Sequence, residues 1–197
     1  MTKPANALRS AEWTVEPCPI GDAVAIIQRE HYARGAPNTA VYTHGLYRRD
    51  DWYPLLGPIE GAALWLPPTR RAAESVADER WRGVLVLSRL VVAPDVPTNG
   101  ASFLLGRSMA AIDRDRWHTL LTYADTAHGH TGAIYRATNW TPLGEVAAGD
   151  TWIGPAGEQR GRKRGGRNRS AADMRAAGYR QVRSRKVKFI HTATRAA

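Results

Sequence analysis

The first part of the chain carries two different spacings of apolar residues. Alternation of apolar and polar residues predicts strands in three segments: residues 12–20, 39–51 and 59–68. Residues 20–35 instead place apolar side chains on one helical face, which predicts a helix that ends at Gly35. Residues 70–81 are polar with helical spacing and predict a short helix or a surface excursion. Strands and helices therefore mix from the beginning of the chain.

The strongest strand signal lies in the middle of the chain. Residues 84–92 are almost all apolar, which predicts a strand buried on both faces, interrupted by Ser88 and Arg89. Further strands are expected at residues 116–125, 144–154 and 178–192, and helices at residues 101–112 and 132–140. The last strand alternates basic and apolar residues, which predicts an edge strand with exposed arginines. The order β-α-β-β-(α)-β-α-β-α-β predicts a mixed α/β domain of two or three layers.

Length and composition fit a globular protein. The chain has 197 residues, 43% of them hydrophobic, enough for one domain or one domain with an appendage. It has no apolar run long enough to span a membrane and no apolar signal core near Met1, so we expect an intracellular protein. Cys18 is the single cysteine, which excludes an internal disulfide and a multi-cysteine metal cluster.

The positive charge is concentrated near the C-terminus. Residues 160–188 hold twelve lysines or arginines and one acid, Asp173, while the remaining residues hold sixteen bases and seventeen acids. Such a tract predicts binding to a polyanion, most often nucleic acid, with a solvated tail as the alternative. We divide the chain into a catalytic domain (1–158) and a basic DNA-binding segment (159–197) that folds back as a terminal strand. The expected phosphate contacts are Arg160, Arg162, Lys163, Arg164, Arg167, Arg169, Arg183 and Arg185.

The turn after the central strand is a candidate anion site. Asn99 and Gly100 form the turn, and Ser102 lies in the first turn of the following helix. Backbone N–H groups at a helix start can bind a phosphate, and the helix dipole favours the negative charge. Many α/β loops share this pattern, so a plain connection is the alternative.

The order of elements resembles the acetyltransferase superfamily known as GNAT. The resemblance implies a central V-shaped mixed β-sheet flanked by helices, with the turn at residues 98–101 holding the pyrophosphate of an acyl-CoA. The segment AIYRATNW resembles the later helix of that fold, where a tyrosine (here Tyr135) lies near the leaving thiol. The turn reads TNGA, without the leading Gln or Arg of the superfamily and with fewer glycines.

Several motifs in order resemble the Mom proteins of bacteriophages, a divergent GNAT branch. They are EHYxRG (His31, Tyr32), LSRLVV (Ser88, Arg89), NGASFLL (Asn99, Gly100, Ser102), YAD (Asp125) and GHxGxIYxAxNW (Gly129, His130, Gly132, Tyr135, Asn139, Trp140). The resemblance implies a double-stranded DNA substrate and conversion of the adenine N6 amino group to N6-carbamoylmethyl. It further implies protection of phage DNA from host restriction, in the cytoplasm of the infected bacterium. The implied donor is an acyl-CoA such as acetyl-CoA, or another acyl or aminoacyl donor, and iron has been suggested for the family.

Adenine N6 is a poor nucleophile, so its modification needs a base and a well-held electrophile. Asp125, at the end of a strand, would accept a hydrogen bond or proton from the amino group, with a turn or helix-cap aspartate as the alternative. Tyr135 would protonate the leaving group or orient the donor, unless it is a core tyrosine. Arg89 would steady negative charge, unless it is an ion-paired structural residue. The expected donor contacts are Ser88, Asn99, Gly100, Ser102 and Asn139.

His31 and Tyr32 are expected to face the site from the opposite side, or only to close the first helix. His31 and Asp125 could act as a base pair or as two ligands of a non-haem iron. His128 and His130 are two residues apart and so do not share a helix face, which leaves His130 a secondary candidate.

The loop at residues 47–58 has the composition of a base-flipping loop. Arg48 and Arg49 could contact phosphate, while Trp52 and Tyr53 could stack on a base or wedge the duplex. The alternative is that the seven tryptophans pack in the core. Two other functions stay open: an acyl-CoA N-acetyltransferase acting on another amine, and a DNA-binding protein without catalysis. The sequence leaves the oligomeric state open, with a homodimer as one alternative.

Overall fold

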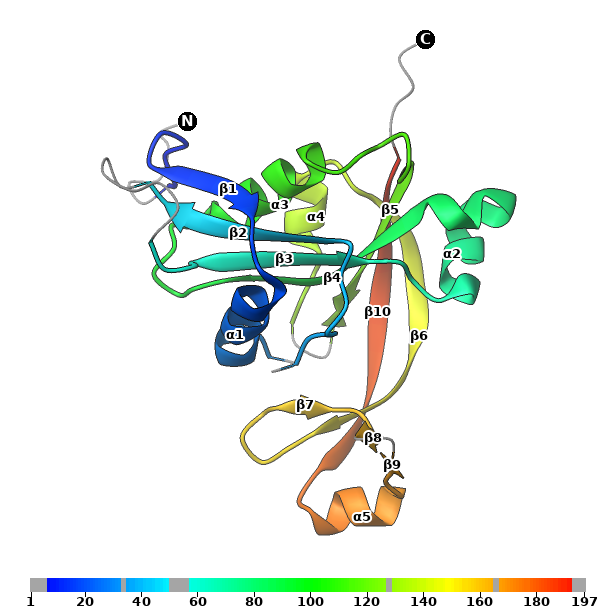
Figure 1. Cartoon of the computed structure of the whole chain (residues 1–197). Coiled ribbons are helices and arrows are strands. Elements are labelled where there is room, and N and C mark those ends of the chain that lie inside the picture. The colour runs from blue at the N-terminus through cyan, green and yellow to red at the C-terminus, as the bar shows by residue number, and fades with distance from the viewer. Residues whose placement is uncertain (1–6, 33–34, 50–56, 127–128, 165–166, 193–197) are drawn as a thin grey trace.

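The computed structural model describes residues 7–32, 35–49, 57–126, 129–164 and 167–192. Most strands join one eight-stranded sheet with the order β1-β2-β3-β4-β5-β10-β6-β7 (Figure 1). These strands are β1 (Trp13–Pro17), β2 (Tyr42–Arg48), β3 (Gly61–Leu66), β4 (Val84–Val92), β5 (Thr119–Asp125), β6 (Thr141–Ile153), β7 (Gln159–Arg160) and β10 (Arg180–Thr192). Within the described residues, β4 and β5 pair in parallel, and the other neighbours in the sheet are antiparallel.

The sheet splits at its centre. β4 and β5 pair only between Val84–Val86 and Thr119–Leu121, at the beginning of both strands. Past these positions the strands diverge, and Figure 1 shows β1–β4 running in one direction and β5, β10 and β6 in another. The predicted mixed α/β fold with a V-shaped central sheet is therefore confirmed.

Helices cover both faces of the sheet. They are α1 (Ile20–Glu30), α2 (Arg70–Ala77), the 3-10 helix η1 (Asp78–Gly83), α3 (Gly100–Ala110) and α4 (Ala133–Ala137); a further helix, α5 (Ala171–Ala176), precedes β10. Alternate residues of β4 separate two sides: Leu85 and Leu87 pack with α3 and α4, whereas Val84 packs with α2. In the same way Leu64 of β3 packs with α1. Thus α1 and α2 share one face, and α3 and α4 share the other.

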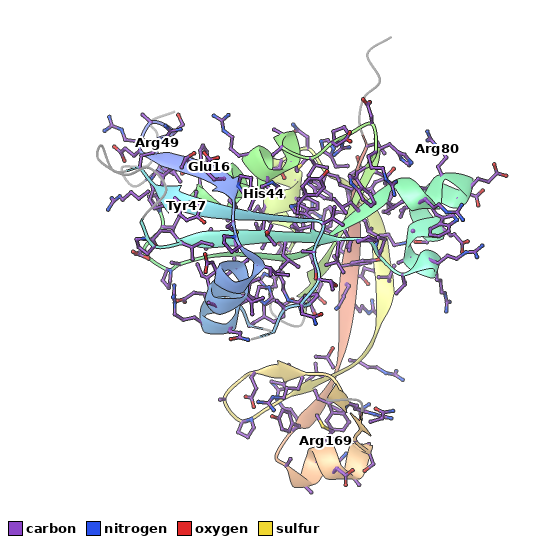
Figure 2. The ribbon with its side chains drawn as sticks, in the orientation of Figure 1. Glu16, His44, Tyr47, Arg49, Arg80 and Arg169 are labelled. Atoms are coloured by element: carbon purple, nitrogen blue, oxygen red, sulfur yellow. The ribbon has the colours of Figure 1, made fainter. Side chains whose placement is uncertain are left out.

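A buried chain of polar contacts crosses the core. Trp65 Nε1 donates to Ser108 Oγ at 2.7 Å, and Ser108 Oγ lies 2.8 Å from His44 Nδ1. Because a tryptophan N–H can only donate, Ser108 Oγ is its acceptor, while the direction of the second bond depends on which ring nitrogen of a neutral His44 carries the proton. Burial lowers the pKa of His44 and favours this neutral imidazole. His44 lies on β2 within the sheet (Figure 2).

The predicted end of the first helix was wrong. Instead of continuing to Gly35, α1 ends at Glu30, because His31 takes an extended conformation with φ −88° and ψ 136°. The apolar pattern could not reveal this end, since it lacks a glycine or proline near residue 31.

The predicted place of the last strand was also wrong. β10 is an interior strand, with β5 on one side and β6 on the other. Only Lys186–Thr192 pairs with β5, while Arg180–Arg185 pairs with β6 alone. The exposed arginines lie in Arg180–Arg185, which has a neighbouring strand on one side only. The alternating pattern therefore predicted the edge position of this portion correctly, but it did not predict that Lys186–Thr192 lies between two strands.

A small lobe, residues 154–179, connects β6 to β10. It contains β7, β8 (Lys163–Arg164), β9 (Arg167–Asn168) and α5, and projects from the rest of the molecule on the long β6–β10 hairpin (Figure 1). α5 begins with a capping box in which the side chains of Ser170 and Asp173 bond each other's backbone N–H. Met174 of α5 is buried, and Trp152 of β6 is buried as well. The sequence did not predict these elements.

Among the described residues, no helix combines the length and apolarity needed to cross a membrane.

Candidate active site

A cavity of about 450 Å³ lies where β4 and β5 diverge. It is lined by the second half of β4, the end of β5, the turn into α4, and His31 and Tyr32 after α1. The strands cannot close this gap because they share only the short pairing at their starts. The V-shape of the sheet therefore creates the site.

Asp125 closes β5 at the wall of this cavity, and its side chain is only 2% exposed. Lys186 of β10 is its direct partner across the antiparallel pair, and Lys186 Nζ lies 3.6 Å from Asp125 Oδ2. The sequence did not predict Lys186, because its position opposite Asp125 depends on the register of an interior strand. Lys186 therefore places a positive charge beside the buried carboxylate of Asp125.

Tyr135 reaches the same cavity from α4. Its ring packs against Phe189 and Trp140, with ring centroids 5.2 and 5.8 Å away. Burial raises the pKa of Tyr135, an effect that the hydroxyl of Thr122 opposes. The phenol is therefore a proton donor at neutral pH.

The turn between Asp125 and Tyr135 depends on two glycines. Gly129 and Gly132 have φ values of 71° and 76°, in the left-handed region that glycine tolerates best. A Cβ on Gly132 would lie 2.3 Å from Cζ of Phe189. Gly132 thus lets the start of α4 lie directly on the sheet, which brings Tyr135 to the cavity that Asp125 lines.

Arg89 of β4 is held firmly at the cavity wall. Its Nε donates to the carbonyl of Gly35 at 2.8 Å, and Nη1 donates to the carbonyl of Ser88 at 2.7 Å. Ser88 also lines the cavity. Burial lowers the pKa of Arg89, while nearby Tyr32 opposes the shift. The guanidinium keeps its charge and sits in a preorganised position.

His31 and Tyr32 enter the site because the chain leaves the helix at Glu30. The Tyr32 ring lies 4.2 Å from that of His31 and 5.3 Å from that of His130, which gives an aromatic cluster at the cavity wall. Burial raises the pKa of Tyr32 to about 12; Asp125 adds to the rise, whereas Arg89 opposes it. The structure thus brings His31, Tyr32, Arg89, Asp125 and Tyr135 to one cavity.

No metal-ligand set supports the iron expectation. Among the described residues, no group of three or more His, Cys, Asp or Glu side chains is placed to hold a metal ion. His31 and Asp125 both line the cavity, but they are only two ligands. His128 lies outside the described residues.

The expected donor contacts on α3 make structural bonds. The Asn99 side chain accepts from the backbone N–H of Leu8 and donates to its carbonyl. Ser102 Oγ donates to the carbonyl of Asn99 at 2.9 Å. A Cβ on Gly100 would lie 2.1 Å from Val96 Cγ1, so close packing also requires this glycine. Their roles in donor binding stay predictions.

Asn139 takes a left-handed conformation with φ 63° just after α4, and its side chain is exposed. It does not belong to the residues that line the cavity. Asparagine tolerates this backbone conformation better than most residues, so it fits the end of a helix. Its role as a donor contact is also a prediction.

The predicted DNA contacts lie in two separate places. Figure 2 shows Arg49 after the end of β2, at the top left of the view, and Arg169 in the lobe at the bottom. Arg48 stacks over Trp13, and Arg49 Nε donates to the Trp13 carbonyl at 3.1 Å. Of the predicted contacts in the lobe and β10, those with exposed side chains are Arg160, Arg162, Arg169, Arg183 and Arg185. Arg185 forms a 2.9 Å ion pair with Glu145.

Some of the proposed DNA contacts cannot be placed. In the lobe, the side chains of Lys163, Arg164 and Arg167 lie outside the described part of the structure. In the loop after β2, Trp52 and Tyr53 also lie outside the described residues. Five of the six tryptophans that the structure describes are buried, and the sixth, Trp81, is half-buried. The core alternative therefore holds for most of the tryptophans.

The comparisons with known proteins agree with this geometry. A model of the Mom protein family matches residues 12–193. No curated protein matches the chain. Among solved structures, the ribosomal-protein-alanine N-acetyltransferase from Brucella melitensis is 12% identical with a TM-score of 0.51, covering 91% of this chain and 99% of its own.

Two further acetyltransferase structures share the architecture. A putative acetyltransferase from Acinetobacter baylyi is 10% identical with a TM-score of 0.54, covering 94% of this chain and 95% of its own. A putative acetyltransferase from Salmonella typhimurium, solved with its cofactor acetyl-CoA, is 11% identical with a TM-score of 0.53, covering 94% and 96%. At these identities the likeness shows the fold, which is that of GNAT acetyltransferases.

Proposed function

The chain belongs to the Mom protein family, and we propose from this premise that it modifies adenine in double-stranded DNA. The reaction would convert the N6 amino group to N6-carbamoylmethyl and so shield phage DNA from restriction. The observation that carries the proposal is the cavity between β4 and β5, where Asp125, Arg89 and Tyr135 line one space. The basic lobe, which lies at the end of the β6–β10 hairpin (Figure 1), would supply a surface for the DNA backbone.

The three side chains divide the chemistry among them. Asp125 would accept the proton that N6 loses as it attacks the donor. Arg89, held by Gly35 and Ser88, would stabilise the negative charge that develops on the donor carbonyl. Tyr135 keeps its proton at neutral pH and would give it to the leaving group. Each group would act from a fixed position, so little reorganisation would accompany the reaction.

An acyl-CoA or an aminoacyl donor would occupy the V-shaped cleft. The relative from Salmonella typhimurium was solved with acetyl-CoA, which supports a donor of the acyl-CoA type. The product also contains an amide nitrogen that an acetyl group lacks. A glycyl thioester or ester carries all the atoms: attack by N6 would release the thiol or alcohol and leave N6-glycyladenine. This amide is an isomer of the N6-carbamoylmethyl product. Attack of the glycyl amine on ring carbon C6, with departure of the amide nitrogen, would complete the conversion.

The acceptor base must leave the duplex to reach the cavity. Base flipping costs unstacking energy, which contacts to the strand and stacking on aromatic side chains offset. Tyr32 and its ring neighbours His31 and His130 offer such a stacking surface inside the site. The exposed arginines of the lobe would hold the flanking phosphates.

The test is the chemistry of cellular DNA. We would express the protein in a bacterium, digest plasmid DNA to nucleosides and measure their masses. We expect deoxyadenosine heavier by one glycyl residue, with fragmentation separating the amide from its carbamoylmethyl isomer. An acetyl adduct would favour an ordinary N-acetyltransferase, and unmodified DNA that still binds the protein would favour a binding protein without catalysis; either outcome refutes the proposal.

Point variants assign the roles of the residues. Asp125→Ala and Tyr135→Phe should abolish the adduct while DNA binding stays within about twofold of wild type. Tyr42→Phe is a matched control, because Tyr42 packs against the core away from the cavity. Normal modification by either site variant would remove that residue from the mechanism.

A second set of variants tests the lobe. Arg160→Ala, Arg162→Ala and Arg169→Ala together should weaken DNA binding and flatten its dependence on salt, by about 0.9 in the log–log slope for each lost phosphate contact. Arg71→Ala is the control, an exposed arginine on α2 outside the lobe. An unchanged slope in the triple variant would exclude the lobe from the interface.

A further inference from the structure

A second cavity lies against the first. It has a volume of about 410 Å³ and is lined by residues 35–37, Gly161 of the lobe, Lys186, Tyr32 and Arg89. Tyr32 and Arg89 also line the first cavity, so the two spaces meet at these side chains. The volume is within the range of small-ligand sites.

The second cavity is cationic. Its charged lining consists of Arg89 and Lys186, and none of the described residues that line it is an acid. Arg89 is tied to this wall through its 2.8 Å bond to the carbonyl of Gly35. Gly161 also lines this cavity, and its two chain neighbours, Arg160 and Arg162, are exposed arginines that add positive charge near the rim. Such a wall suits an anion, and guanidinium and ammonium groups together suit a phosphate.

Lys186 links the two cavities. It lines the second, whereas Asp125, 3.6 Å from its ammonium group, lines the first. The two residues are directly opposite each other on β10 and β5, so their side chains leave the sheet on the same face. A phosphate beside Lys186 would therefore lie close to the group that receives the amino proton.

We propose that the second cavity binds a backbone phosphate of the acceptor nucleotide through Lys186, with Arg89 adding positive charge at the shared wall, while its base passes Tyr32 into the first cavity. This inference rests on the proposed function, because it assigns the acceptor's entry path. The lobe and the second cavity would then contact the same DNA strand, and Gly161 lies where the lobe borders this cavity. Lys186 positions the nucleotide and does not take part in the chemical step.

The test compares binding of deoxyadenosine, its 5′-monophosphate and its 3′-monophosphate by titration calorimetry. Wild type should bind at least one monophosphate about tenfold or more tightly than the nucleoside, as expected for one charge-assisted contact. Lys186→Met should lose that preference. Lys188→Met is a matched control, since Lys188 is a lysine of the same strand that bonds Ser75 of α2 outside the cavity. Lys186→Arg should keep the preference.

Asp125→Asn tests the same contact from the other side of the ion pair. It removes the anion that competes for Lys186, so monophosphate binding should be retained or strengthened even though modification is lost. If Lys186→Met fails to fold, the double variant Lys186→Met/Asp125→Asn replaces it, because both charges of the pair are removed. Equal binding of nucleoside and monophosphates by wild type, or an unchanged preference in Lys186→Met, would overturn the inference.

The two proposals can fail separately. A protein that modifies DNA in cells but does not distinguish the nucleoside from its monophosphates keeps the proposed function and loses the phosphate site. A protein that leaves DNA unmodified, yet shows a phosphate preference dependent on Lys186, keeps the phosphate site and loses the proposed function.

Discussion

Gly132 is where the turn from β5 meets the helix that carries Tyr135. It has a left-handed backbone and is buried against Phe189. Gly129, three residues earlier, has nearly the same φ, but a Cβ there would have nothing within 4 Å. The pair Gly132→Ala and Gly129→Ala therefore separates the cost of the backbone conformation from the cost of crowding Phe189.

The magnitudes differ for a physical reason. Alanine in a left-handed conformation costs roughly 1–2 kcal/mol, and this applies to both variants. Reduced entropy of the unfolded chain returns about 0.4–1 kcal/mol in both. Only Gly132→Ala adds overpacking, because its methyl group would lie 2.3 Å from a ring carbon of Phe189, which is fully buried. Overpacking typically costs about 1–3 kcal/mol, which is the expected difference between the variants.

Urea unfolding measures this difference directly, provided that the transition is two-state. Gly132→Ala combined with Phe189→Leu should show a favourable coupling energy, because a smaller side chain makes room for the methyl group. In cells, Gly132→Ala should reduce DNA modification through displacement of Tyr135, with DNA binding unchanged. Equal losses of stability in the two alanine variants would refute the contact between Gly132 and Phe189 as the determinant of the helix position.

Three further predictions concern stability. Ser108→Ala should lower the free energy of unfolding by about 1–3 kcal/mol in urea titrations, because it leaves the indole N–H of Trp65 buried without its acceptor. Burial lowers the pKa of His44, so the unfolded chain binds a proton at this residue more readily than the folded protein. The melting temperature should therefore be constant above about pH 6.5 and fall below it. His44→Gln should show a smaller fall in melting temperature over the same pH range. Met174→Ala should speed amide hydrogen exchange in the lobe and leave exchange in β4 and β5 unchanged, since the buried Met174 stabilises α5 locally.

Much of the fold could be predicted because its core segments are strongly patterned. The predicted bounds of β4 match the structure at both ends, since a long apolar run between turn residues favours a buried strand over other secondary structure. Two errors have a common origin in tertiary structure. His31 ends α1 although its residue type permits a helix, and β10 gains a second neighbour that its own alternation cannot reveal. The short elements of the lobe lack periodicity altogether, so the sequence did not predict them.

The site residues likewise fall into those that the sequence motifs predicted and those that depend on tertiary contacts. Motif order brought together Arg89, Asp125 and Tyr135, and the structure places all three around one cavity. Lys186 was treated only as part of a basic tract, because its contact with Asp125 requires the register of β10 on β5. The side chain of Asn99 looked available for a ligand in the sequence, whereas it bonds the backbone of Leu8, ninety-one positions away.

Because β10 lies between β5 and β6, the central sheet stays incomplete until residues 180–192 have entered it. Until then β5 presents unpaired backbone groups, an edge that invites association with other chains. The late pairing of distant segments also predicts slow folding. Since the lobe joins β6 to β10, insertion of the last strand brings the two ends of the lobe together. The cleft that would hold the base and the lobe that would hold the DNA backbone are therefore expected to form in one cooperative step, so partly folded chains would have neither.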